Sequence, residues 1–274
     1  MTNQSKLSAL RPIATKNAIE EVVFTLLLSD KIQLKPAENF GKLHEGDFKH
    51  TFPKFDTITL QGWSFNQNEA VMANPEVIGF TFESYNPSSG ALTKRLRGER
   101  QDDVNSPAWV AVNILEYDRW DGESEKAYNW LSKFLEVQDD VEVLGVSLHY
   151  IDALFWESAT KLPFDGIFNP NSIYLPAKID NNAEKWSSKI AYEEKSKNKK
   201  LQNELNVALA LNSQNGFQKV SISNPLTYRY NSPISMKQHL NTIIKADFQD
   251  LHDMNKSILK NIFQSEVLSL IGMV

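Results

Sequence analysis

The chain has 274 residues, of which 41% are hydrophobic and 23% charged, and its formal net charge is −5. These values are typical of a globular protein with one large or two modest domains, and they exclude a disordered or fibrous chain. The sequence has no cysteine, which excludes a disulfide framework, a thiolate zinc site and a cysteine nucleophile.

The N-terminal segment, residues 1–17, is polar and shows no hydrophobic period, so we predict a flexible arm. It lacks the apolar core of a signal peptide. No stretch of the chain approaches the roughly 20 apolar residues that span a bilayer. We therefore expect a cytoplasmic protein that does not enter a membrane.

Strands dominate the next part of the chain. The apolar run 21–29 indicates a buried strand, and Pro36 is expected to open a helix that ends near Lys49. From Phe55 to Tyr117 apolar and polar residues alternate, as they do in half-buried strands.

A helix of about fifteen residues follows, with Asp121 as its expected N-cap. The longest strand candidate then covers residues 141–156. The segment 162–180 contains three prolines, which is typical of a boundary between domains. We therefore predict an N-terminal α+β lobe over residues 18–160 and a C-terminal lobe over 161–274, with one continuous domain as the alternative.

The C-terminal lobe is predicted to be a β-meander followed by a long helix. Successive strands favour antiparallel pairing, and three candidates precede the helix, at residues 186–194, 201–211 and 217–230. Ser235 and Gln238 have the spacing of a capping box, and a helical stripe continues to about Leu270. The predicted fold class is α+β, with mostly antiparallel sheets in two lobes, a mid-chain helix and a long C-terminal helix.

This last helix is the predicted partner-binding element. At roughly 35 residues it would span about 50 Å, which is longer than a lobe of this size covers. We expect the exposed remainder of its apolar stripe to bind a protein partner or a second copy of the chain, whereas packing across both lobes is the alternative. The stripe consists of Leu240, Ile244, Phe248, Leu251, Ile258 and Ile262.

Asp152 is the first candidate catalytic or ligand-binding residue. Strand alternation places it on an apolar face together with Tyr150, the second candidate, and with Leu154. Burial there would raise the pKa of the carboxyl unless a partner stabilised its charge. The functional interpretation is a general acid or a ligand contact in a cleft. The alternative is a turn to solvent or a structural hydrogen bond. His149 is expected on the opposite face.

An acidic run surrounds Trp120 at the start of the mid-chain helix. Paired carboxylates there would hold a cation or catalyse hydrolysis, whereas the alternative is a solvated corner between strand and helix. The run consists of Glu116, Asp118, Asp121, Glu123 and Glu125.

A basic segment follows one of the predicted turns and is the candidate contact for nucleic acid or phosphate. The alternative is an exposed edge strand whose charges prevent aggregation. The segment carries Lys94, Arg95, Arg97 and Arg100.

No metal site and no cofactor are expected. His44 and His50 are six residues apart, so they do not share a helix face. His239 and His252 are thirteen apart on one helix, about 20 Å by its rise. We interpret these histidines as surface or cap residues. The sequence contains no phosphate loop, dinucleotide fingerprint, nucleophile elbow or kinase motif set.

The order and spacing of several short segments resemble a sporadically distributed family of prokaryotic proteins with no established activity. The segments are 19–24 (IEEVVF), 117–121 (YDRWD), 148–152 (LHYID), 251–256 (LHDMNK) and 262–263 (IF). The match covers nearly the whole chain. It implies an α+β fold, a prokaryotic or phage origin, and an accessory role in a mobile element or a defence system.

The chain also departs from this family. The family often has prolines where Asn17 and Ala18 stand, and it often has arginine and asparagine at the positions of His149 and Asp152. An amide in place of Asp152 could serve a structural role but could not act as an acid. This difference argues against a catalytic acid at this position.

The leading functional prediction is a non-enzymatic binding or assembly protein that acts with a protein partner or as a homo-oligomer. The first alternative is a ligand-binding or hydrolytic cavity that uses Asp152, Tyr150 or the acidic run. The second alternative is a nucleic-acid contact through the basic segment, which the net charge of −5 does not favour.

Overall fold

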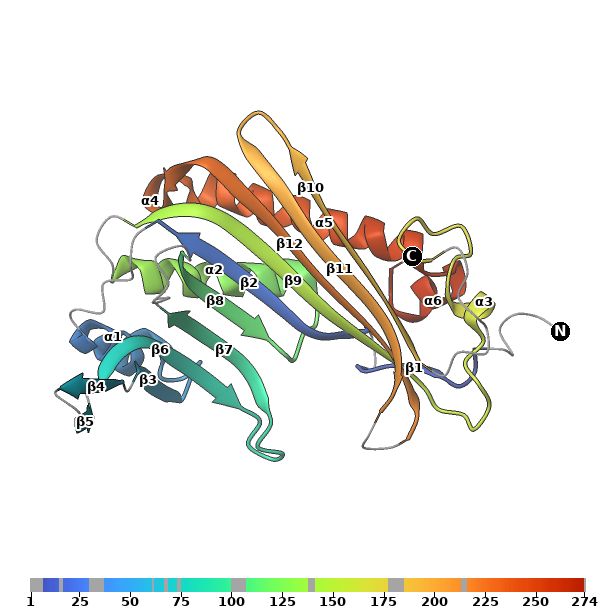
Figure 1. The fold of residues 1–274 in the computed structure, drawn as a ribbon, viewed down its shortest axis with the longest axis horizontal. Coiled ribbons are helices and arrows are strands. Elements are labelled where there is room, and N and C mark those ends of the chain that lie inside the picture. The colour runs from blue at the N-terminus through green and yellow to red at the C-terminus, as the bar shows by residue number, and fades with distance from the viewer. Residues whose placement is uncertain are drawn as a thin grey trace.

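The computed structural model describes residues 7–14, 17–29, 37–60, 62–66, 69–72, 75–99, 107–137, 141–176, 185–212 and 216–273. Ten strands form one antiparallel sheet, and the main helices lie on one of its faces (Figure 1). The structure therefore confirms the predicted α+β class with mostly antiparallel pairing and a long helical segment at the C-terminal end. None of the described helices is long and apolar enough to cross a membrane.

Along the chain, helices separate groups of successive strands. The strands are β1 Leu10–Pro12, β2 Ile19–Leu28, β3 Lys54–Leu60, β4 Trp63–Asn66, β5 Glu69–Met72, β6 Glu76–Tyr85, β7 Leu92–Glu99, β8 Ala108–Ile114, β9 Glu142–Trp156, β10 Trp186–Lys195, β11 Lys199–Leu211 and β12 Gln218–Ser235. The helices are α1 Ala37–Leu43, η2 His44–Phe48, α2 Trp120–Glu136, α3 Phe164–Ile167, α4 Met236–His239, η3 Leu240–Ile244, α5 Lys245–Ile262 and α6 Ser265–Leu270.

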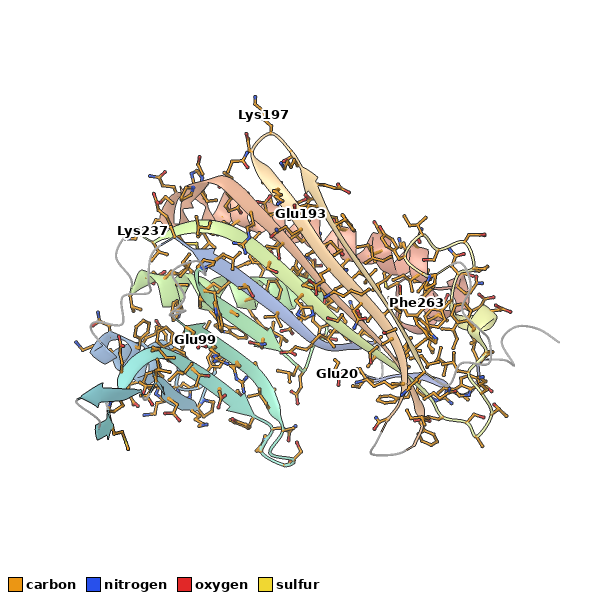
Figure 2. All side chains as sticks on the ribbon, in the orientation of Figure 1. Glu20, Glu99, Glu193, Lys197, Lys237 and Phe263 are labelled. Atoms are coloured by element: carbon orange, nitrogen blue, oxygen red, sulfur yellow. The ribbon has the colours of Figure 1, made fainter. Side chains whose placement is uncertain are left out.

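The strand order in the sheet is β10-β11-β12-β9-β2-β8-β7-β6-β3, with β1 also paired to β9, while β4 and β5 form a separate hairpin. The expected boundary between residues 160 and 161 does not divide this sheet. Strand β9 lies before that boundary and β12 after it, yet the two pair along most of their length, from Gln218 opposite Trp156 to Ser235 opposite Glu142. Figure 2 shows Lys197 at the tip of the turn that joins β10 to β11.

The hydrophobic core lies between the sheet and the helices. Alternate residues of β2, such as Val22, Phe24 and Leu26, are fully buried, because strand side chains point to opposite faces in turn. The ring of Phe24 packs against Phe248 of α5 with 5.4 Å between centroids, and it stacks on Trp120 of α2 at 5.5 Å. These contacts hold both helices against the middle of the sheet.

The predicted partner-binding stripe is part of this core. All six of its residues are buried within the chain, with Leu240 the most exposed at 8%. The expectation that they bind a partner is therefore wrong for this fold. The helix lies across a sheet that spans both halves of the chain, so its whole stripe has an intramolecular surface to cover.

The C-terminal helix is also divided, where the sequence predicted one element. The backbone of Phe263 is extended, with φ −100° and ψ 153°, and it forms a β-bridge with Phe168. The two rings stack at 5.8 Å, and Gln264 N–H donates to the carbonyl of Ile167. This long-range pairing overrides the local helical pattern and separates α5 from α6.

Neither predicted helix cap forms a side-chain hydrogen bond. Arg119 is the N-cap of α2, so Asp121 lies in the first turn, where its charge still suits the helix dipole. Ser235 does occupy the N-cap position of α4, but its hydroxyl does not bond to the backbone of that helix.

Candidate ligand-binding cavity

A cavity of about 390 Å³ lies between the sheet, the start of α2 and the middle of α5. Its walls come from segments that are far apart in the sequence. They are residues 17–19, residues 117–120, the β9 residues Tyr150 and Asp152, four residues of α5 (His252, Asn255, Lys256 and Leu259), and residues 271–273 near the C-terminus.

Four of the segments on which the family resemblance rests meet at this cavity. The segments 117–121, 148–152 and 251–256 each supply lining residues, and Ile19 opens the segment 19–24. Segments that are up to about 230 positions apart in the sequence therefore converge on one enclosed space. The observation makes this cavity the candidate functional site.

Asp152 supplies the buried carboxyl of the cavity wall. Its side chain is 4% exposed and shares its face of β9 with Tyr150, as strand alternation predicts. The Oδ2 atom has no hydrogen-bond partner among the described residues. Burial raises the pKa of Asp152 to about 7 because it removes water from the charged form. The alternative of a carboxyl turned to solvent is therefore excluded.

The strand beside Asp152 is irregular. Ile19 pairs with Asp152 and Glu21 pairs with Ile151, so one extra residue of β2 bulges out of the ladder at this point. Such bulges bend a strand and re-aim its side chains. This one lies where β2 enters the sheet and where residues 17–19 form part of the cavity wall.

Tyr150, which neighbours Asp152 on the same face of β9, forms a connected group with His252 of α5 and Trp120 of α2. Tyr150 Oη lies 2.8 Å from His252 Nδ1, and the indole of Trp120 stacks on the imidazole at 4.1 Å with only 3° between the planes. Burial, reinforced by the charge of Lys256, lowers the pKa of His252 to about 4. The imidazole is therefore neutral near pH 7, and its Nδ1 forms a hydrogen bond with the Tyr150 hydroxyl.

Two tyrosine hydroxyls stay protonated beside Asp152. Burial raises the pKa of Tyr150 well above its ordinary value, and burial is also the largest cause of the raised pKa of Tyr117. The cavity thus presents aromatic rings and neutral hydroxyl groups near one buried carboxyl. Its rim carries the longer side chains of Arg119 and Lys256.

A chain of buried amides leads from the sheet to the cavity. Asn203 Nδ2 donates to Asn224 Oδ1 at 2.9 Å, and Asn224 Nδ2 donates to Asn255 Oδ1 at 2.7 Å. Asn255 is 3% exposed and lines the cavity. The bond from Asn224 fixes the orientation of the Asn255 amide and occupies its Oδ1. The NH₂ group of Asn255 therefore remains as a hydrogen-bond donor toward the cavity.

The sequence identified two of these residues and missed the others. Asp152 and Tyr150 were found by strand alternation, and the structure brings them into one cavity. His252 was interpreted as a surface or cap residue, but it is mostly buried and bonded to Tyr150. A signal for it exists, because His252, Asn255 and Lys256 have the i, i+3, i+4 spacing of one helix face.

The acidic run does not form a second site. Glu123 is buried and pairs with Lys126 at 2.7 Å, while Glu125 pairs with Lys245 of α5. Asp118 lies at the rim of the cavity, and Glu116 is exposed. Among the residues that the structure describes, no group of three histidines and carboxylates has a metal-ligand arrangement.

The basic segment is split between the two faces of the sheet. Lys94 lies on the helix side, with its ammonium 5.6 Å from the ring centre of Trp130. Arg95 and Arg97 lie on the opposite face, where both line a second, shallower cavity. Arg100 is outside the described residues. The predicted four-residue contact is therefore not one surface.

Comparison of the chain with protein-family models, curated proteins and solved structures found no match. The family resemblance accordingly stays a prediction.

Proposed function

We propose that the chain is a binding protein and that the cavity beside Asp152 holds a small ligand with a cationic group. One observation carries this proposal. A carboxyl group that is 4% exposed presents an oxygen with no hydrogen-bond partner among the described residues, on the wall of a cavity large enough for a small molecule.

A cationic ligand group compensates for the cost of this burial. An ionised carboxylate without a partner is destabilised in an apolar environment, and a protonated amine or an amidinium group supplies both an opposite charge and an N–H donor. The rings of Tyr117, Tyr150 and Trp120 line the same space. Aromatic faces attract cations through their quadrupole, so they suit the same ligand class.

A hydrolytic role for the cavity is the second candidate. With a pKa of about 7, Asp152 is partly protonated near neutral pH and has the proton-donor state that a general acid needs. The pKa of His252 is lowered to about 4, so its imidazole is a weak base near neutral pH and is poorly suited to activate the Tyr150 hydroxyl. We therefore place ligand binding first.

Benzamidine and benzamide test the ligand class, because they have nearly the same shape and only benzamidine is cationic. At about pH 8 and ten times its dissociation constant, we expect benzamidine to raise the melting temperature by about 2 °C and benzamide to leave it unchanged. In Asp152→Asn the difference between the two probes should vanish. In Asp165→Asn, which removes an exposed carboxyl away from the cavity, it should persist.

Equal shifts with the two probes, or a benzamidine shift that survives in Asp152→Asn, would rule out the cation site. Hydrolytic activity is distinguished separately, because a general acid at Asp152 predicts ester or glycoside cleavage that falls as pH rises through about 7 and is absent in Asp152→Asn.

The prediction of an assembly role rests on the long C-terminal helix and the lack of a catalytic motif, whereas the link to mobile elements or defence rests on the family resemblance. Since the apolar stripe of α5 is buried, a protein partner or a second copy must use another surface. Light scattering over a wide concentration range tests self-association, and a constant monomer mass would contradict a homo-oligomer.

A further inference from the structure

The face of the sheet opposite the helices carries a groove of about 420 Å³. Its lining comes from six adjacent strands, in the sheet order β11, β12, β9, β2, β8 and β7. Among the described residues, its lining contains no carboxylate and three arginines, namely Arg95 and Arg97 of β7 and Arg229 of β12. It is separate from the cavity at Asp152, which lies on the helix side of the same sheet.

Arg95 and Arg229 are each anchored through the Nε edge of the guanidinium. Arg95 Nε donates to Glu83 Oε1 at 2.9 Å, and Arg229 Nε donates to Gln202 Oε1 at 3.1 Å. These bonds leave the two terminal NH₂ groups of each guanidinium fork unused. A fork that is held in place loses less conformational entropy when it binds an anion, so the groove is pre-organised.

Arg97 is held differently. Its Nη2 bonds to Glu99, and its guanidinium lies 5.5 Å from the ring centre of Trp109. Its Nε is buried and has no hydrogen-bond partner among the described residues. The guanidinium lies over the indole ring, and aromatic bases stack favourably on both kinds of group.

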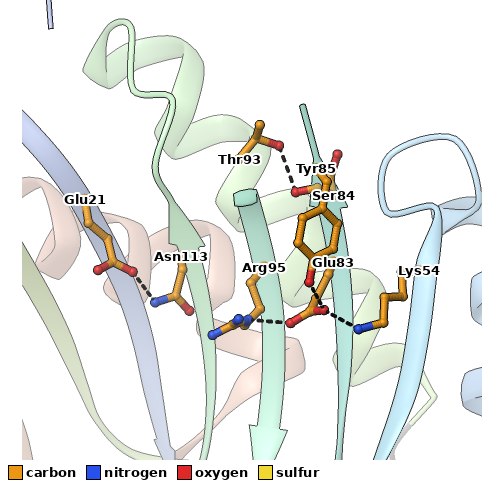
Figure 3. A network of polar contacts seen from close by, with 8 residues as sticks. All are labelled: Glu21, Lys54, Glu83, Ser84, Tyr85, Thr93, Arg95 and Asn113. Carbon is orange, nitrogen blue, oxygen red and sulfur yellow. Dashed lines mark hydrogen bonds and ion pairs between the residues drawn. The ribbon is translucent and has the colours of Figure 1, made fainter. Parts of the chain in front are cut away.

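The carboxylates around the groove are themselves bonded. Glu83 accepts from Tyr85 and Lys54 as well as from Arg95 (Figure 3). Burial would raise the pKa of Glu83, but these hydrogen bonds and charges outweigh burial and lower it. Three further carboxylates at the border of the groove also bond to lining residues. Glu99 bonds to Arg97, Glu21 to Asn113 and Glu193 to Gln202. Glu83 and Glu99 thus balance the charges of Arg95 and Arg97, while Arg229 bonds to the neutral amide of Gln202.

The remaining lining residues suit a base rather than an apolar protein segment. Neutral donors and acceptors stand between the arginines: Thr25, Asn113, Ser147, Gln202 and Thr227. The apolar part is small, with Val23, Leu27 and Ala111 beside Trp109. Cores of protein interfaces are more apolar than this, whereas amide, hydroxyl and guanidinium groups recognise base edges and phosphates.

We infer that this groove binds nucleotide units, with phosphate on the arginine forks and a base against the Arg97–Trp109 surface. The ligand comes either from single-stranded nucleic acid or from free nucleotides, since both present the same groups. The net charge of −5 provides no long-range attraction, so binding depends on these local arginines and must weaken steeply with salt.

Fluorescence anisotropy with two probes tests the inference: a fluorescein-labelled oligothymidylate of about 15 nucleotides, and mant-labelled ADP. At about 50 mM salt we expect micromolar binding of at least one probe. The probe that binds identifies the source of the ligand. Arg97→Gln and Arg229→Gln should each weaken binding about 10-fold and lower the salt slope by about 0.7 per lost contact.

Lys94→Gln is the matched control, because it removes the same charge from the same strand but on the helix face. It should leave binding unchanged, while far-UV circular dichroism verifies that every variant is folded. The inference would be overturned if neither probe binds, or if the arginine variants bind as tightly as the natural chain. Tighter binding of a fluorescein-labelled polyglutamate of similar length would also overturn it. The Asp152→Asn variant should bind both probes as the natural chain does, which keeps this test independent of the cavity.

Discussion

Asp152 and His252 lie on the same cavity, and their buried side chains make opposite contributions to the pH dependence of stability. The pKa of Asp152 rises from 3.8 to about 7 on folding, so the folded state binds more protons between these values and stability falls as pH rises. The pKa of His252 falls from 6.5 to about 4, so the unfolded state binds more protons there and stability rises with pH. The two contributions largely cancel between about pH 4 and pH 6.5.

Replacing Asp152 by asparagine exposes the first contribution. Relative to the natural chain, Asp152→Asn should gain unfolding free energy as pH rises from about 4 to 7, by as much as about 4 kcal/mol. The natural chain must carry a buried charge at the higher pH, whereas the amide stays neutral. Urea titrations at several pH values measure the difference. Asp165→Asn serves as the exposed control, and a difference that does not change with pH would contradict the burial of Asp152.

Replacing His252 by glutamine exposes the second contribution, with the opposite sign. At neutral pH the variant should be less stable, because Tyr150 loses its hydrogen-bond partner at His252 Nδ1 and Trp120 loses its stacking partner. As pH falls from about 7 to 4 this deficit should shrink by about 3 kcal/mol, since glutamine has no proton to take up. The same urea titrations test it, and a deficit that grows at low pH would show that the imidazole is charged in the folded state.

At the scale of single elements, the close approach of two strands depends on a glycine. A Cβ added at Gly145 in β9 would lie 2.2 Å from the carbonyl oxygen of Tyr228 in β12. Backbone atoms have no freedom to move aside as a flexible side chain does, so the strand pairing itself would have to shift. Gly122 in α2 has open space at the corresponding position.

These two glycines make a matched pair of substitutions. Gly145→Ala should lower the unfolding free energy by about 2 kcal/mol or more, through strain in the β9–β12 pairing. Gly122→Ala should raise it by up to about 1 kcal/mol, because alanine loses less backbone entropy in a helix. Thermal unfolding measures both. Equal effects of the two substitutions would contradict the close contact at Gly145.

At the scale of the whole molecule, the two halves of the chain share one core. Residues of the expected N-terminal lobe, such as Phe24 and Leu148, belong to the same buried cluster as Leu226 and Phe248 from the expected C-terminal lobe. The sheet continues through the β9–β12 pair without interruption. A core that crosses the boundary couples the stability of both sides.

We therefore expect one cooperative unfolding transition. Urea curves followed by tryptophan fluorescence and by far-UV circular dichroism should coincide. The fluorescence reports on both expected lobes, since Trp109 lies in β8 before the expected boundary and Trp186 lies in β10 after it. Leu148→Ala in the central strand should move both curves together, by about 2 to 5 kcal/mol. Two separated transitions would instead support independent lobes.

The sequence by itself determined the approximate positions of β2, α2, β9 to β12 and the C-terminal helical segment, and the face on which Asp152 lies. Those features depend on local sterics, since side chains alternate every second residue in a strand and recur every 3.6 residues in a helix. Strand β9 and the burial of Tyr150 with Asp152 follow from this alternation alone.

The tertiary structure decided everything that depends on which distant segments meet. Pairing of β9 with β12 turned two expected lobes into one sheet, and that sheet buried the helix stripe that had been expected to bind a partner. The same packing brought His252 and Trp120 to Asp152, and it placed Arg229 in one groove with Arg97. A local pattern does not encode these contacts, because they join residues that lie from about thirty to more than a hundred positions apart in the sequence.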